Sequence, residues 1–127
     1  IQELYVTITD AAVNRESGYS ALVQNTIAYI KNNYSKNISL SDAAEVSQVS
    51  SSYLSLIFKQ ETGVNFSNYL TDYRMEMAKK MLVTTNKKIY EIADEIGFSS
   101  PYYFSKVFKK YTGMTCKEYK DKYTGMH

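Results

Sequence analysis

The sequence contains the same short pattern twice, separated by a constant 50 residues. Residues 39–63 align with residues 89–113 without a gap, and 12 of the 25 aligned positions are identical or keep apolar character. The identical pairs are Ala43/Ala93, Glu45/Glu95, Ser50/Ser100, Tyr53/Tyr103, Ser55/Ser105, Phe58/Phe108, Lys59/Lys109, Thr62/Thr112 and Gly63/Gly113. This agreement predicts a duplicated supersecondary unit. Each copy is too short to be an independent domain, and each predicts a short helix, a tight turn and a second helix.

The composition favours a small helical protein. The 127 residues are 44% apolar and 14% aromatic, enough for a hydrophobic core, and only one Pro and five Gly interrupt them. This length allows one domain or two small lobes. No apolar run approaches the roughly 18 residues that a membrane span needs, and no secretory signal pattern is present. The chain does not begin with Met, which favours a fragment of a longer protein.

The residue types that usually carry covalent or metal chemistry are scarce. Cys116 is the single cysteine and the single histidine is the last residue, His127. One Cys excludes an internal disulfide and fits a reducing, cytoplasmic compartment. One Cys and one terminal His do not supply a tetrahedral zinc site or a Ser-His-Asp arrangement. We therefore expect no enzymatic activity, no cofactor and no metal.

Apolar periodicity and capping residues predict an all-α fold of about seven helices. The expected helices cover about 21–34, 39–46, 50–63, 66–83, 88–96, 100–113 and 115–123. Two helix-turn-helix units, 39–63 and 88–113, are thus joined by a long helix at 66–83 within a domain of residues 21–127. Residues 1–20, in which Leu4, Val6 and Ile8 alternate with polar residues, are expected to be a short strand or a linker from a missing upstream domain.

The length of the joining helix indicates which kind of partner could contact both copies of the repeated unit. About 18 residues at 1.5 Å per residue span roughly 27 Å, and with the girth of the flanking helices the two units can lie about 34 Å apart, one turn of DNA. The net charge of +2 is unevenly distributed, since residues 1–78 sum to −3 and residues 79–127 to +5. A basic half beside an acidic half favours a polyanion as the partner of the basic half.

Three segments carry a resemblance to a known family. Residues 88–115 read KIYEIADEIGFSSPYYFSKVFKKYTGMT, residues 50–63 read SSSYLSLIFKQETG, and Tyr69-Leu70 is followed by RMEMA at 74–78. Together they resemble the signature of AraC/XylS-type transcription regulators, over about residues 21–123. Two departures from the family pattern are Cys116 in place of Pro and Lys120 in place of Arg. A third is Leu56, where family members often carry a basic residue.

The resemblance implies a sequence-specific, double-stranded DNA-binding domain of a bacterial transcription regulator. The second helix of each unit would enter one of two successive major grooves of a promoter. Family members usually carry a sensor or receiver domain as well, so we expect a missing N-terminal domain of this kind. The resemblance also implies activation through RNA polymerase, with repression left open.

One face of each second helix is predicted to meet the bases. Packed stripes are expected at Leu54, Ile57 and Phe58 and at Phe104, Val107, Phe108 and Tyr111, which leaves the opposite face free. The expected base-reading residues on that free face are Ser52, Ser55, Leu56, Tyr102, Ser105 and Lys106. Lys106 suits guanine O6 and N7, and Leu56 suits the methyl group of thymine. Alternatively, Leu56 packs on a neighbouring helix or on a missing domain, and Tyr102 is an ordinary surface tyrosine.

A second set is expected to contact phosphates, which fixes register without reading sequence. It comprises Ser50, Ser51, Lys59, Lys87, Ser99, Ser100, Lys109 and Lys110. The serines lie at helix N-termini, where simple capping is the alternative role. We expect Arg74, near Asp72 and Glu76, to form an ion pair within the domain.

Two other classes of protein remain in view. A duplicated helical scaffold could be a protein-interaction module that binds a partner helix through Leu56, Tyr102 and Tyr103. A DNA-repair enzyme carrying this module would need a reactive cysteine, and Cys116 beside a helix cap suits that chemistry poorly.

Overall fold

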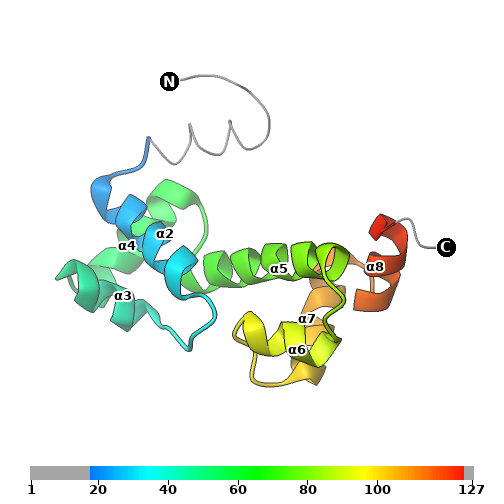
Figure 1. Ribbon diagram of the computed structural model, residues 1–127. Helices are drawn as coiled ribbons and strands as arrows, with labels where there is room; N and C mark the ends of the chain where they lie inside the picture. The colour runs from blue at the N-terminus through cyan, green and yellow to red at the C-terminus, as the bar shows by residue number, and fades with distance from the viewer. Residues whose placement is uncertain (1–17, 125–127) are drawn as a thin grey trace. The chain divides into compact units, whose positions relative to one another are not determined.

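The computed structural model describes residues 18–124, and within this range every regular element is an α-helix. The elements are α2 (Ala21–Asn33), α3 (Leu40–Ser47), α4 (Ser51–Thr62), α5 (Phe66–Thr84), α6 (Ile89–Glu95), α7 (Pro101–Thr112) and α8 (Cys116–Thr124) (Figure 1). The expected all-α fold of about seven helices, with a long fourth helix joining two helix-turn-helix units, is therefore confirmed for the described residues, in which the long helix is α5. The strand or linker expected at residues 1–20 lies almost wholly outside them.

The described residues divide into two compact units. Unit 1 comprises residues 18–32 and 38–68, and unit 2 comprises residues 33–37 and 69–124. Helix α5 begins in unit 1 and continues in unit 2, so it joins the two helix-turn-helix motifs through the chain.

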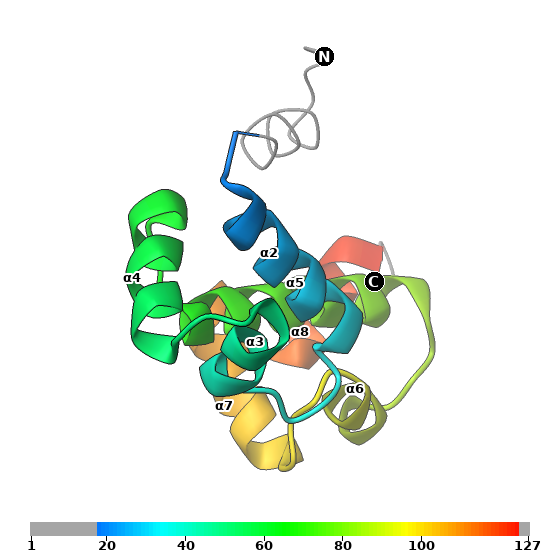
Figure 2. The same cartoon turned by 90° about the vertical axis from the view of Figure 1, so that its left-hand side faces the viewer.

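Each unit has its own apolar core. In unit 1, α3 packs beside α4 (Figure 2), and the core side chains are Val23, Ile27, Ile30, Ala43, Ala44, Leu54, Phe58 and Phe66. In unit 2, α7 packs against both α6 and α8, around Met75, Ala78, Leu82, Ile92, Ala93, Ile96, Phe104, Phe108 and Cys116. The equivalent phenylalanines Phe58 and Phe108 are both fully buried. Burial of each ring stabilises its unit by roughly 1.5–3 kcal/mol.

The caps of the two motifs repeat with the sequence. Ser50 Oγ accepts a hydrogen bond from Tyr53 N at 3.1 Å, and Ser100 Oγ accepts one from Tyr103 N at the same distance. Gly63 and Gly113 end α4 and α7 in the left-handed region, with φ of 85° and 80°, which a side chain would disfavour. Local chemistry thus fixes where both second helices begin and end.

The capping box expected at the start of α3 is also present. Ser39 Oγ accepts from Asp42 N at 3.2 Å, and Asp42 Oδ2 accepts from Ser39 N at 3.0 Å.

Arg74 corrects one expectation. Its guanidinium does not pair with a neighbouring carboxylate but donates Nε to Tyr34 O and Nη2 to Lys36 O, both at 2.9 Å. It also lies over the Phe98 ring, 5.7 Å from its centroid. The prediction was wrong because the α2–α3 connection passes within reach of α5 and offers two backbone carbonyls that need donors.

Gly97 lies beside Arg74 and Tyr34 in unit 2. It has φ of 96°, and a Cβ at this position would lie 2.7 Å from Tyr34 O and 2.8 Å from Arg74 Nη2. The turn between α6 and α7 therefore requires the absence of a side chain for two independent reasons.

Candidate nucleic-acid interface

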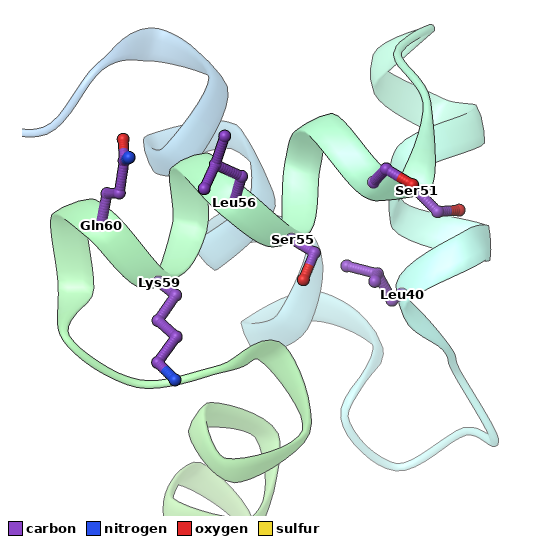
Figure 3. A pocket seen from close by; sticks show the side chains of 7 residues that line it. Leu40, Ser51, Ser55, Leu56, Lys59 and Gln60 are labelled. Carbon is purple, nitrogen blue, oxygen red and sulfur yellow. The ribbon is translucent and has the colours of Figure 1, made fainter.

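The exposed face of α4 forms one wall of a shallow groove in unit 1. The groove has a volume of about 750 Å³ and is lined by Leu40, Ser51, Ser52, Ser55, Leu56, Lys59 and Gln60. Figure 3 shows that all but one of the lining residues belong to α4, whereas Leu40 comes from α3. A hydrogen bond of 3.3 Å between Ser41 Oγ and Ser51 Oγ ties the two helices together beside it.

Helix α7 presents an equivalent groove in unit 2. Its volume is about 600 Å³, and its lining is Ile89, Tyr102, Ser105, Lys106, Lys109, Lys110, Thr115, Cys116 and Lys117. Lys106 Nζ lies over the Tyr102 ring, 5.4 Å from its centroid. This contact between residues four apart on one helix holds the ammonium group at the exposed face.

The two grooves are related by the sequence repeat. Five positions of α4 that line the first groove recur 50 residues later in the lining of the second. The pairs are Ser52/Tyr102, Ser55/Ser105, Leu56/Lys106, Lys59/Lys109 and Gln60/Lys110. All six residues expected to read bases therefore lie on a groove-lining face of a second helix. Their contact with bases stays a prediction.

The exposure of Leu56 decides one of the alternatives. Leu56 is 56% exposed, so within the described structure it does not pack on a neighbouring helix. Tyr102 is 74% exposed. Tyr53 and Tyr103 are also more than half exposed, and Tyr103 contacts the Phe98 ring.

Tyr111 is a further correction. It was expected in the packed stripe of α7, but it is 42% exposed, and its hydroxyl interacts with Asp72. Partial burial and this hydrogen bond raise the pKa of Tyr111. Tyr111 shares the helix face of Phe104, and the carboxylate of Asp72 on α5 gives its hydroxyl a partner at the edge of the core.

The residues expected to contact phosphate fall into three groups. Ser50 and Ser100 cap α4 and α7, Ser51 is the first residue of α4, and Ser99 is exposed just before the second cap. Lys59, Lys109 and Lys110 are exposed, and no ion pair involves them within residues 18–124. Their contact with phosphate stays a prediction.

Lys87 differs from the other lysines. Its Nζ lies 2.8 Å from Glu95 Oε2, and this hydrogen bond raises the pKa of Lys87. It lines a separate hollow of about 460 Å³ that it shares with Glu91, Asp94 and Glu95. A phosphate at Lys87 would have to compete with these carboxylates, which weakens the case for that role.

Several residues that line the two grooves were not among the predicted site residues. Gln60 was missed although its repeat partner, Lys110, was chosen, and the constant offset of 50 would have found it. Leu40 and Lys117 come from α3 and α8, which flank the second helices. No helical periodicity within α4 or α7 could have indicated them.

Other kinds of site find no support in the described part of the chain. No group of His, Cys, Asp and Glu side chains there is suited to hold a metal ion. No helix among the described residues has the length and apolar character required to cross a membrane. Cys116 is buried, and burial raises the pKa of its thiol to about 11, which disfavours the reactive thiolate.

Two helix-turn-helix motifs on one chain, each with an exposed groove-lining second helix, define a DNA-binding domain of the double helix-turn-helix class. Comparison with known proteins gives the family. A family model described as "Helix-turn-helix domain" matches residues 43–122. The chain is 48% identical over 92 residues to the uncharacterized transcriptional regulatory protein YesN of Bacillus subtilis, a match that covers 70% of this chain and 25% of YesN.

Solved structures agree with this match. The C-terminal domain of AraT, a response regulator from Geobacillus stearothermophilus, superimposes with a TM-score of 0.80 at 36% identity, over 87% of this chain and 96% of that domain. The DNA-binding domain of AdpA in complex with a target DNA shares the fold, with a TM-score of 0.78 at 21% identity over 84% of this chain and 96% of that one. The chain belongs to the AraC-type helix-turn-helix DNA-binding domains of bacterial transcription regulators.

Proposed function

We propose that this chain binds a promoter duplex by placing α4 and α7 in two successive major grooves. The observation that carries the proposal is the repeat of the exposed face of α4 at five equivalent positions of α7. Each of these faces lines a shallow groove. A duplex presents its major groove again after one turn, about 34 Å along the axis, so a duplicated reading helix suits it.

The chemistry of the two faces fits this role. Lys106, held beside Tyr102, donates to guanine O6 and N7, and the hydroxyls of Ser52, Ser55 and Ser105 contact base edges. Lys59, Lys109 and Lys110, with the capped N-termini of α4 and α7, bind phosphates and set the register.

The same proposal places the domain in a longer cytoplasmic regulator. The chain spans a quarter of the length of YesN, and AraT is described as a response regulator. We therefore expect an N-terminal receiver or sensor domain to control the two motifs. Activation through RNA polymerase is the outcome implied by the resemblance to AraC/XylS-type regulators.

The test begins with selection of binding sites from a random duplex library, followed by fluorescence anisotropy at several salt concentrations. If Lys59, Lys109 and Lys110 each contact a phosphate, the slope of log Kobs against log salt is roughly −2.7. A flat slope, or a selection that yields no consensus, would favour the protein-interaction module instead. Lys80→Gln, an exposed lysine on α5, serves as a control that should leave the slope unchanged.

Hydroxyl-radical footprinting tests the two-groove geometry separately. Two protected blocks about 10–10.5 base pairs apart on one face of the duplex are expected. A single block would mean that only one of the two helices enters a groove.

A further inference from the structure

We propose that the two motifs bind DNA through different interactions. Leu56 of α4 recognises the 5-methyl group of a thymine by an apolar contact, whereas the lysines of α7 supply most of the attraction to the phosphates. This inference rests on the proposed function and names the base that one of its positions recognises.

The difference in charge between the two helices is the first observation. Helix α4 carries one lysine, Lys59, and one acid, Glu61, whereas α7 carries Lys106, Lys109 and Lys110 and no acid. Two of the five equivalent groove positions, Leu56/Lys106 and Gln60/Lys110, replace a lysine by an uncharged residue in the first motif. The groove of α4 therefore attracts a polyanion weakly and depends on contacts that do not require charge.

The exposure of Leu56 is the second observation. Its side chain is 56% exposed on the groove-lining face of α4, between the serines and Lys59. Figure 3 shows Leu56 on the same helix as Ser55 and Lys59, with Leu40 contributed by α3. Thus the wall that would face the bases has an apolar group from each of two helices, Leu40 and Leu56, with serine hydroxyl groups between them.

The chemistry of the base edges indicates which base Leu56 contacts. The major groove of B-DNA offers one apolar group in an otherwise polar surface, the C5-methyl group of thymine. Lysine at the equivalent position of α7 suits the O6 and N7 acceptors of guanine. The two motifs are therefore expected to prefer different bases at matching positions, and the operator is asymmetric.

Replacement of thymine by deoxyuridine tests the inference, because it removes the methyl group and keeps the hydrogen-bonding pattern. Each thymine of a selected duplex is replaced in turn, and affinities are measured for the wild-type chain and for Leu56→Ala. One position should lose about fourfold in affinity with the wild type, as burial of one methyl group predicts, and should lose nothing with Leu56→Ala.

Lys106→Ala is the matched control on the equivalent position of α7. The uracil effect at the thymine coupled to Leu56 should persist in this variant. Leu56→Lys should shift the selected base at that position from thymine towards guanine. Because Leu56 and Lys106 are exposed, these variants should fold, and circular dichroism melting curves are the check.

The outcomes separate this inference from the proposed function. If the chain binds a selected duplex tightly and with the expected salt dependence, but every uracil substitution changes the affinity equally for the wild type and for Leu56→Ala, this inference alone is overturned. Failure to select any duplex overturns the proposed function and this inference together.

Discussion

Replacing Lys106, Lys109 and Lys110 by Gln removes the three positive charges of α7 and should make DNA binding much less sensitive to salt. All three ammonium groups are exposed, and none is paired with a carboxylate within residues 18–124, in contrast to Lys117, which pairs with Asp121 at 3.3 Å. Each phosphate contact contributes about 0.9 to the slope of log Kobs against log salt, and Lys109 and Lys110 are the two residues of α7 assigned to phosphates, so the triple variant should lose roughly 1.8. Between 50 and 200 mM salt, the wild-type chain should therefore lose about 12-fold more affinity than the variant.

The assay is fluorescence anisotropy with a selected duplex at five or more salt concentrations. A variant with Lys36, Lys80 and Lys122 replaced by Gln loses the same net charge from exposed positions outside α7 and serves as the control. An equal decrease of slope in both triple variants would show that net charge, and not the face of α7, determines the salt dependence. An unchanged slope in the α7 variant would refute the assignment of these lysines to phosphates and bases.

Four further outcomes are expected, three from single substitutions and one from chemical labelling of the wild-type chain. Lys106→Ala should weaken binding to a selected duplex by about 1–3 kcal/mol, more than Leu56→Ala does, and equal small effects in a titration would contradict the assignment of the two faces. Arg74→Ala leaves two backbone carbonyls without their charged donor and should lower the free energy of unfolding by about 2–4 kcal/mol in urea denaturation. Gly97→Ala should cost more than the roughly 1 kcal/mol of left-handed strain alone, because its Cβ meets a backbone oxygen at 2.7 Å; a melting temperature close to that of the wild type would refute this. The pKa of about 11 leaves the thiol of Cys116 almost wholly protonated at pH 8, so alkylation there should be far slower than in the unfolded chain, and rapid labelling of the folded chain would show that the thiol is accessible.

The repeated motifs were predictable because they depend on interactions close in sequence. The capping hydrogen bonds of Ser50 and Ser100 join residues three apart, and Gly63 and Gly113 satisfy local backbone requirements. The expected helix limits consequently agree with the structure to within one or two residues. The buried stripes of α4 and α7 were predicted for the same reason, since helical periodicity places Leu54 near Phe58 on one face.

The errors occur where a residue meets a distant segment. Arg74 was assigned to carboxylates on its own helix, but its partners Tyr34 and Lys36 are 40 and 38 residues away in the sequence. Tyr111 was placed in the core by periodicity, but its hydroxyl interacts with Asp72 on another helix and its ring stays partly exposed. Periodicity predicts which face of a helix is apolar, but it does not show what the neighbouring helix offers at the edge of that face.

The sequence alone determined that the chain is helical, that it carries two copies of one motif, and which face of each second helix is polar, because these properties depend on residue spacing and local capping. Only the tertiary structure decided that Leu56 is exposed, that Leu40 and Lys117 border the grooves, and that Arg74 holds the connection between α2 and α3. Those properties depend on packing between segments far apart in the chain, and a repeat in the sequence does not specify that packing.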